Sequence, residues 1–322
     1  MARLDEALRK QPFEVVKTAC FQSAEMIRAF RASSLDLPWA RLETGTQLLF
    51  KLLFISICHK INWDFLQRRL SERFLGEGED RLLERALRMT PARMTELIGD
   101  YPRKERIRGA ERAALMKDVA STLVGLFGGD AMVLYARSNR KIGGQAGFLE
   151  QIDAFRAYRE DPLRKKSNVL VQELVREGIV EFLDVSDVAP AIDYHIMRLY
   201  LRSGRVLPTA AAVFEHLRVA ERSETRLRLD KLLREATAEA LRYTAFYAGL
   251  TVPVVNYIEW QIGRARCHDQ RPNCLGECTL SEADADVIRL SPSACPYAGF
   301  CPALVDPQWG ELREPILQKA YY

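Results

Sequence analysis

Five of the chain's seven cysteines lie close together near its end, and the other two, Cys20 and Cys58, stand alone in apolar stretches. The clustered five are Cys267, Cys274, Cys278, Cys295 and Cys301. Thiolates are soft ligands, and four of them suit either a tetrahedral zinc ion or a [4Fe–4S] cluster. In a reducing compartment such a group indicates a metal site rather than disulfides, because thiols stay reduced there. Both metal sites remain open at this point.

The segment that enters the cluster, WQIGRARCHDQRPNC from Trp260 to Cys274, resembles the cluster loop of the endonuclease III branch of the helix-hairpin-helix DNA glycosylases. That family has a Gly-Arg pair, a cysteine, a six-residue basic spacer and a second cysteine, and it ends with a pair separated by five residues. The spacers Cys267–Cys274 and Cys295–Cys301 match. The resemblance implies an iron–sulfur cluster, with structural zinc as the alternative.

The middle of the cluster loop departs from the family. Twenty residues, rather than two, separate Cys274 from Cys295, and Cys278 lies among them. The resemblance therefore implies Cys267, Cys274, Cys295 and Cys301 as the cluster ligands. Cys278 is the competitor for the third position.

A second resemblance to the same superfamily lies upstream. APAIDYHIMRLYLRSGRV, from Ala189 to Val206, is similar to the segment in which a catalytic aspartate precedes an Arg-containing helix, and it is closest to the archaeal 8-oxoguanine DNA glycosylases. Asp193 falls on that aspartate. RKKSNVLVQELV, from Arg164 to Val175, has the form of the earlier helix that begins with a nucleophilic lysine. Lys166 fits that lysine best, with Lys165 one residue away.

This pair has a chemical rationale. A carboxylate stabilises the positive charge that develops on the sugar when an N-glycosidic bond breaks. A lysine attacks C1′ and forms a Schiff base when its amine is neutral, and the neighbouring cations Arg164 and Lys165 favour the neutral form. The resemblance thus implies a DNA N-glycosylase with AP-lyase activity, acting by base flipping on a modified, for instance oxidised, purine. Without the resemblance, Lys166 would be taken for a solvated lysine and Asp193 for a helix cap.

The family's Leu-Pro-Gly-Val-Gly hairpin is absent before the lysine, where the chain has REDPLR. In the family those glycine amides hold a DNA phosphate, so binding of an ordinary duplex is in question. Two alternatives therefore stay open. One is a non-catalytic nucleic-acid-binding protein that retains the fold and the cluster, and the other is a glycosylase of nucleotides or modified nucleosides in a phage-defence system.

Further candidates for nucleic-acid contact flank these motifs. Asn62 or His59 could fill the gap left by a flipped base, and Trp63 could stack on a base, although core or helix-cap roles suit all three. Arg140 and Lys141, followed by Gly143-Gly144, form a candidate phosphate-binding loop, with a plain solvated loop as the alternative. Lys165 is a candidate phosphate contact, and His195 is expected to be structural.

Helical periodicity runs through nearly every segment that must position these residues. Apolar residues recur at three- and four-residue steps, and Thr90-Pro91 is a helix start signal. No run of alternating strands is evident, so the pattern predicts an all-α fold. With the resemblance, it predicts two lobes. One spans residues 40–205 with Lys166 and Asp193, and the other combines 1–39 with 206–266, followed by a cluster loop and tail over 267–322.

Composition narrows the classes further. The 322 residues carry a net charge of +4, with 47 basic against 43 acidic side chains, which permits a polyanionic partner without requiring one. The most apolar run, from Leu48 to Cys58, contains Lys51 and is too short to cross a bilayer, and no secretory signal is evident. We therefore expect a cytoplasmic protein that binds no membrane, and the resemblance implies a monomer that binds duplex or single-stranded DNA.

Overall fold

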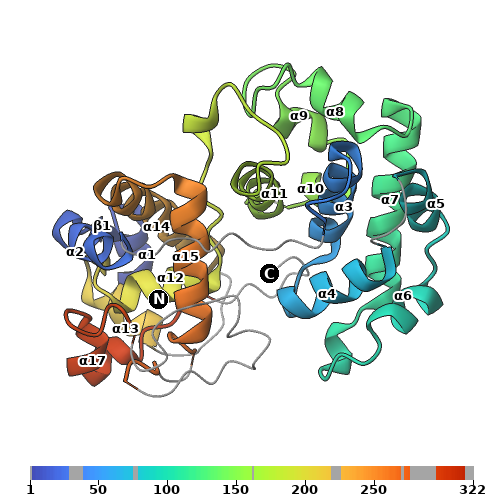
Figure 1. Cartoon of the computed structure of the whole chain (residues 1–322). Coiled ribbons are helices and arrows are strands. Elements are labelled where there is room, and N and C mark those ends of the chain that lie inside the picture. The colour runs from blue at the N-terminus through green and yellow to red at the C-terminus, as the bar shows by residue number, and fades with distance from the viewer. Residues whose placement is uncertain are drawn as a thin grey trace. The chain divides into compact units, whose positions relative to one another are not determined.

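The computed structural model describes residues 2–28, 39–74, 79–161, 163–218, 226–269, 272–275 and 295–315. In these residues the fold is all-α, as the periodicity predicts (Figure 1). The sheet they contain has two short antiparallel strands, β1 (Phe13–Val15) and β2 (Val206–Pro208), in which Val15 pairs with Val206. No single helix in these ranges is long and apolar enough to cross a membrane.

The chain divides into two compact units, of which the first contains Met1–Leu35 and Ala189–Lys319. Its core forms where α2 and β1 pack on α14, and where α12 packs on α14 and α15. Its helices are α1 (Ala2–Arg9), α2 (Lys17–Ile27), α12 (Tyr194–Arg202), α13 (Ala211–Arg218), α14 (Arg226–Ala248), α15 (Val252–Ala265), α17 (Pro302–Val305) and α18 (Pro307–Gly310).

A glycine sets the distance between α12 and α15. A Cβ atom on Gly263 would lie 2.7 Å from the carbonyl oxygen of His195, which is closer than real Cβ atoms approach backbone. Only glycine therefore lets these two helices approach so closely at this point. The contact matters because α12 follows Asp193 and α15 leads into the cysteine segment.

The second unit contains Asp36–Val188. Its helices are α3 (Thr44–Ile57), α4 (Trp63–Phe74), α5 (Glu79–Leu87), α6 (Pro91–Ile98), α7 (Gly109–Phe127), α8 (Ala131–Arg137), α9 (Phe148–Ile152), α10 (Arg156–Arg159) and α11 (Lys165–Arg176), with short 3₁₀ turns at Lys104–Arg106 and Val185–Asp187. Helix α3 is apolar on nearly all sides because α5, α7, α8 and α11 all pack against it. The start signal at Thr90-Pro91 is confirmed, since the Thr90 side chain caps α6.

The division between the units falls at Val188–Ala189, whereas the sequence analysis placed the lobe boundary after residue 205. Helix α12 packs on α14 and α15, so it belongs with the N- and C-terminal segments. Asp193 consequently lies in the first unit and Lys166 in the second. Amphipathic periodicity shows that a helix has an apolar face but not which neighbour covers it, which is why the boundary was misplaced.

Candidate functional site

Lys166 lies in the first turn of α11, in the second unit. Asp161 fixes the start of this helix, because its Oδ2 accepts a hydrogen bond of 2.7 Å from the backbone nitrogen of Lys166. The lysine side chain then runs inward, and the residue is only 3% exposed. Its Nζ donates to the carbonyl oxygen of Ser56, in the last turn of α3, at 2.7 Å. The amine is thus buried against a neutral acceptor.

The surroundings of Lys166 favour a neutral amine. Burial lowers its pKa to about 8, with a further contribution from the Arg112 guanidinium, while Cys58 and Asp161 act in the opposite direction. Nearby His59 responds to the same environment, since burial and then the charges of Lys166 and Arg112 lower its pKa to about 2. Desolvation and like charge are the two physical means of activating a lysine as a nucleophile.

Asp193 is the N-cap of α12, in the first unit. Its Oδ1 accepts from the backbone nitrogen of Ile196 at 3.0 Å, and its Oδ2 accepts from the indole nitrogen of Trp260 at 3.0 Å. The residue is 5% exposed. The capping role, considered from the sequence as the plain alternative, is therefore present. Trp260 was quoted only as part of the cluster motif, because its contact with Asp193 spans 67 residues of chain.

The backbone that leads into Asp193 is held from α14 and α15. The side chain of Asn256 accepts from the backbone nitrogen of Ala191 at 2.8 Å and donates to the oxygen of the same residue at 3.4 Å. Arg234 donates to the carbonyl oxygen of Ile192 and is itself held by Asp230 at 2.8 Å. These contacts, which the sequence analysis missed, make the carboxylate part of a preorganised segment.

The four expected ligands Cys267, Cys274, Cys295 and Cys301 are all buried, and none forms a disulfide. A thiol–thiol hydrogen bond with Cys295, together with burial, raises the pKa of Cys274 to about 12, while the hydrogen bond with Cys301 acts in the opposite direction. Cys267 interacts electrostatically with both Cys274 and Cys301. The twenty-residue insertion is thus compatible with close approach of the four side chains. Cys278 lies outside the described residues.

Two arginines of α12 contact the cysteine segment. Arg202 directs Nη1 at the Cys267 sulfur, 3.6 Å away, and donates to the Leu312 carbonyl oxygen at 2.9 Å. Arg198 donates to the Cys267 carbonyl oxygen at 2.6 Å and pairs with Glu314 at 2.7 Å. The helix capped by Asp193 therefore also anchors the cysteines. Among the described residues, however, no group of three or more His, Cys, Asp or Glu was found that could hold a metal ion.

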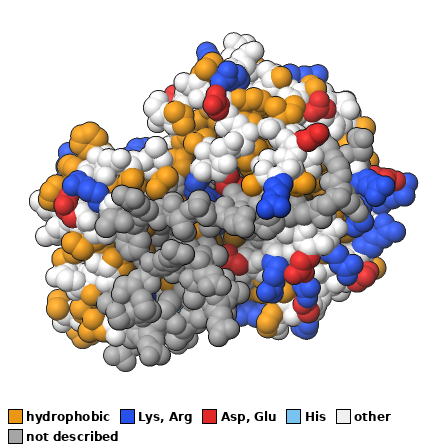
Figure 2. Space-filling view, in the orientation of Figure 1, with side chains coloured by type: hydrophobic (Ala, Val, Ile, Leu, Met, Phe, Trp, Pro, Cys, Tyr) orange, Lys and Arg blue, Asp and Glu red, His pale blue; other side chains and the backbone are white. Residues whose placement is uncertain are grey.

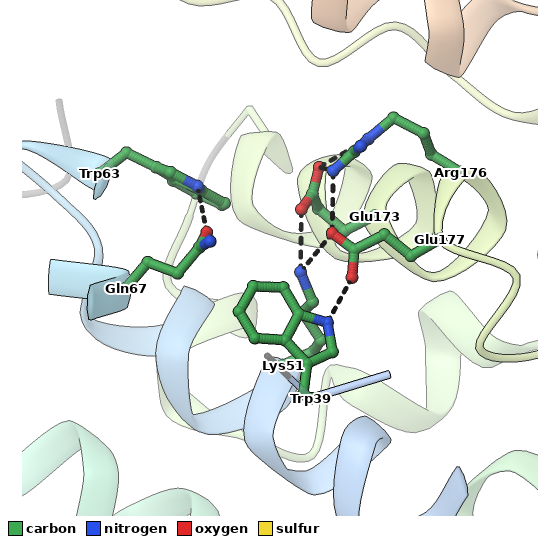
Figure 3. Close-up of polar contacts among 7 residues, drawn as sticks. All are labelled: Trp39, Lys51, Trp63, Gln67, Glu173, Arg176 and Glu177. Carbon is green, nitrogen blue, oxygen red and sulfur yellow. Dashed lines mark hydrogen bonds and ion pairs between the residues drawn. The ribbon is translucent and has the colours of Figure 1, made fainter. Parts of the chain in front are cut away.

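The remaining candidates have local structural partners. The Asn62 side chain caps α4 by accepting from the Phe65 nitrogen at 2.8 Å. Trp63 donates to Gln67 at 2.8 Å (Figure 3), and His195 contacts Arg198 through its Nδ1. These contacts are of the kind that the sequence analysis offered as the plain alternatives.

The candidate phosphate loop is already engaged by acidic side chains of its own unit. The backbone nitrogens of Ile142 and Gly143 donate to the Asp184 carboxylate at 2.7 and 3.1 Å, and Arg140 pairs with Glu181 at 3.0 Å. Lys141 is exposed on this loop, and Lys165 is half-buried at the start of α11. A phosphate at the loop amides would have to displace a carboxylate.

A buried ion network, shown in Figure 3, joins α3 to α11. Lys51 contacts Glu173 at 3.0 Å and Glu177 at 2.6 Å, and the Trp39 indole donates to Glu177 at 2.8 Å. Arg176 bridges the same two carboxylates at 2.9 and 2.8 Å. Burial and the neighbouring Glu173 raise the pKa of Glu177 to about 7. From the sequence only Lys51 stood out, as a charge inside an apolar run.

No protein-family model matches the chain, and a search of curated proteins finds no significant match.

Proposed function

We propose that this chain is a helix-hairpin-helix-type DNA N-glycosylase with AP-lyase activity, in which Lys166 is the nucleophile and Asp193 the supporting carboxylate. The observation that carries the proposal is the buried Lys166 amine, which bonds a neutral carbonyl and has a pKa lowered to about 8. At pH 7 roughly a tenth of such amines are neutral, compared with fewer than about one in a thousand for an ordinary lysine.

The neutral amine supplies the electron pair for the reaction. Its nitrogen bonds to C1′ of the sugar while the C1′–base bond breaks, and the electrons of that bond leave with the base, which takes up a proton. The attacking nitrogen loses a proton, and its electron pair forms the C1′=N bond of a protonated Schiff base while the C1′–O4′ bond breaks and O4′ takes up a proton. Loss of a C2′ proton then expels the 3′ phosphate by β-elimination. No metal or redox step is needed for this sequence.

Asp193 is proposed to stabilise the positive charge that develops on the sugar as the base departs. Three contacts support this role by limiting the side chain's freedom: the Ile196 amide, the Trp260 indole and the anchored backbone at Ala191. A carboxylate held in advance contributes more to the transition state than one that must be ordered during the reaction.

Cys267, Cys274, Cys295 and Cys301 are the residues that would hold a [4Fe–4S] cluster, with structural zinc as the alternative. The four thiols are buried and disulfide-free, and an arginine is directed at the Cys267 sulfur, but among the described residues their arrangement does not form a group that could hold a metal ion. When bound, the cluster would cross-link Cys267 and Cys274 with Cys295 and Cys301 and so stabilise the fold of this part of the chain. A brown colour, with iron and acid-labile sulfide that are lost in Cys267→Ser, would support this assignment, and stoichiometric zinc would exclude the cluster.

A glycosylase of nucleotides or modified nucleosides is the second candidate. It is favoured by two observations: the glycine hairpin is absent, and the amides at Ile142 and Gly143 are already bonded to Asp184. Both observations weigh against the usual means of holding a duplex. The modified-purine preference rests on the archaeal resemblance alone.

Borohydride trapping tests the proposal. The protein is incubated with duplex and single-stranded oligonucleotides that carry an oxidised purine or an abasic site, and sodium borohydride reduces any Schiff base to a stable adduct. We expect an adduct with the wild type and with Lys165→Ala but none with Lys166→Ala. Base release without an adduct would indicate that water, and not Lys166, is the nucleophile. Activity on nucleosides alone would select the second candidate.

A further inference from the structure

A cluster of basic side chains lies beside the turn that follows α3, away from the loop expected to bind phosphate. It consists of Lys60, Arg106 and Arg108, which we call the basic turn cluster. Arg112 donates to the carbonyl oxygens of both His59 and Arg106, so the turn that carries Lys60 lies beside the segment that carries Arg106 and Arg108. Burial first, and then the charges of Arg108 and Arg106, lower the pKa of Lys60, while Glu111 raises it. None of them was singled out in the sequence analysis, since they come from two segments more than forty residues apart.

The buried Arg112 side chain connects these two segments by hydrogen bonds to their backbone. It is fully buried, and it donates to the carbonyl oxygens of His59 at 2.6 Å, Ile107 at 2.8 Å and Arg106 at 3.0 Å. A single guanidinium thus bridges the turn after α3 and the loop before α7. Five N–H donors in a fixed plane suit this task.

Neighbouring backbone fixes the cluster further. Lys60 and Arg108 both adopt left-handed backbone, with φ of 54° and 46°, which is uncommon for residues other than glycine. Gly109, next to Arg108, permits the start of α7 to abut α6, since a Cβ there would lie 2.4 Å from the Thr95 hydroxyl oxygen. The segment that carries Arg108 therefore packs closely against α6.

Acidic side chains offset only part of this charge. Glu111 pairs with Arg108 at 3.0 Å, and Glu105 lies 3.8 Å from Arg106. Glu111 also acts on Lys60, whose pKa it raises. On the face of the molecule in Figure 2, basic side chains lie among acidic ones.

The cluster lies next to the proposed nucleophile within the second unit. The Lys166 amine bonds the Ser56 carbonyl, four residues before Lys60. His59, directly before Lys60, has its pKa lowered by the charges of Lys166, Arg112, Arg108 and Lys60 alike. The end of α3 and the turn after it therefore contain both Ser56, which accepts from the Lys166 amine, and Lys60 of the basic turn cluster.

We propose that the basic turn cluster binds phosphodiester oxyanions of a nucleic acid and so holds the strand beside Lys166. Like charges kept close at a folding cost are stabilised when a phosphate enters between them. The claim that the strand lies beside Lys166 rests on the proposed function, whereas the claim that the cluster binds phosphate does not. The expected ligand is polymeric phosphate, and a free nucleotide is the competing source of the same chemistry.

The test measures fluorescence anisotropy of a labelled duplex and a labelled single strand that carry an uncleavable abasic analogue, over a range of salt concentrations. The variant Lys60→Asn/Arg106→Gln removes two charges, and Asn suits the left-handed backbone at position 60. We expect about tenfold weaker binding near 100 mM salt and a slope of log K against log [salt] smaller by about 2. Lys60→Arg should retain the wild-type slope.

The matched control is Arg88→Gln/Lys231→Gln, which also removes two charges from exposed, ion-paired positions. Equal affinities and slopes for the cluster variant and this control would overturn the proposal. So would weaker binding of a nucleoside 5′-monophosphate with unchanged DNA binding, since that result would assign the site to free nucleotides.

The two proposals fail separately. If the wild type gives no borohydride adduct while the cluster variant still loses affinity and slope, the nucleophile assignment fails and the phosphate surface stands. If the adduct forms equally in both at every DNA concentration, the phosphate surface fails and the nucleophile stands. Thermal unfolding of each variant establishes that the compared proteins are folded.

Discussion

Lys51 and Lys166 are both buried lysines between α3 and α11, but their amines have opposite surroundings. Lys51 contacts two carboxylates and lies over the Trp39 ring, 4.4 Å from its centroid. The Lys166 amine bonds the Ser56 carbonyl, and burial lowers its pKa to about 8 although Cys58 and Asp161 act in the opposite direction. The first environment stabilises an ammonium and suits a structural role, while the second favours the free amine.

The difference shows that burial alone does not mark a reactive lysine. Two carboxylates supply the negative charge that a buried ammonium needs, and together with Arg176 they form a balanced network. At Lys166 burial is the largest influence on the pKa and lowers it, with a smaller contribution from Arg112 in the same direction. The two amines differ in that Lys51 contacts two carboxylates, whereas at Lys166 desolvation outweighs the charges that favour the ammonium.

The largest effect should come from Lys166→Met. We expect adduct formation to fall at least about a thousandfold, because the covalent nucleophile is removed. Stability should not fall in parallel. The folded pKa of about 8 lies below the unfolded value of 10.5, so at pH 7 the buried ammonium costs up to about 3 kcal/mol, and this cost disappears as pH rises from 8 to 10.5.

Denaturant unfolding at pH 7 and at pH 10 measures this difference. A loss of several kcal/mol at pH 7 in Lys166→Met would mean that Lys166 is a structural lysine like Lys51.

Lys51→Met should give the opposite result. Removing the cation leaves two adjacent buried carboxylates, and we expect a loss of about 3–5 kcal/mol in the free energy of unfolding. Adduct formation per folded molecule should stay near the wild-type level. Urea unfolding, with trapping at a temperature where the variant is folded, measures both quantities. Lys51→Met/Glu177→Gln is the matched control and should recover part of the loss.

The rate of adduct formation should depend on pH through the protonation of Lys166. Because the neutral amine attacks, the single-turnover rate of adduct formation with cyanoborohydride should rise about tenfold per pH unit below pH 8 and level off above it. The rate in Lys51→Met should show the same profile. A profile that is flat between pH 6 and pH 9 would contradict the role assigned to the desolvated amine.

A smaller effect is expected at the carboxylate. Trp260→Phe keeps the aromatic packing but removes the N–H that Asp193 accepts, and we expect kcat to fall about tenfold with little change in KM. Trp260→His, which restores a ring N–H donor, should recover part of the rate. Trp309→Phe is the control for a tryptophan in the same unit. An equal loss in both variants would indicate a general packing effect.

Local sequence signals predicted the elements well. Thr90-Pro91 predicts the start of α6, and the residue types at Asn62 and Asp193 suit the caps that both side chains form. These are interactions within one turn, so the sequence contains all their partners. The lobe boundary and the contact between Trp260 and Asp193 were not predicted, because each depends on which helices pack together.

The sequence by itself determined an all-α fold, the helices that begin near Lys166 and Asp193, and a group of cysteines with spacing suited to a metal. Only the tertiary structure decided that Lys166 is desolvated against Ser56, that Lys51 is paired, and that Lys60 lies with Arg106 and Arg108. The physical reason is that periodicity and capping act over a few residues. A side chain's protonation depends instead on charges and burial supplied by distant parts of the chain.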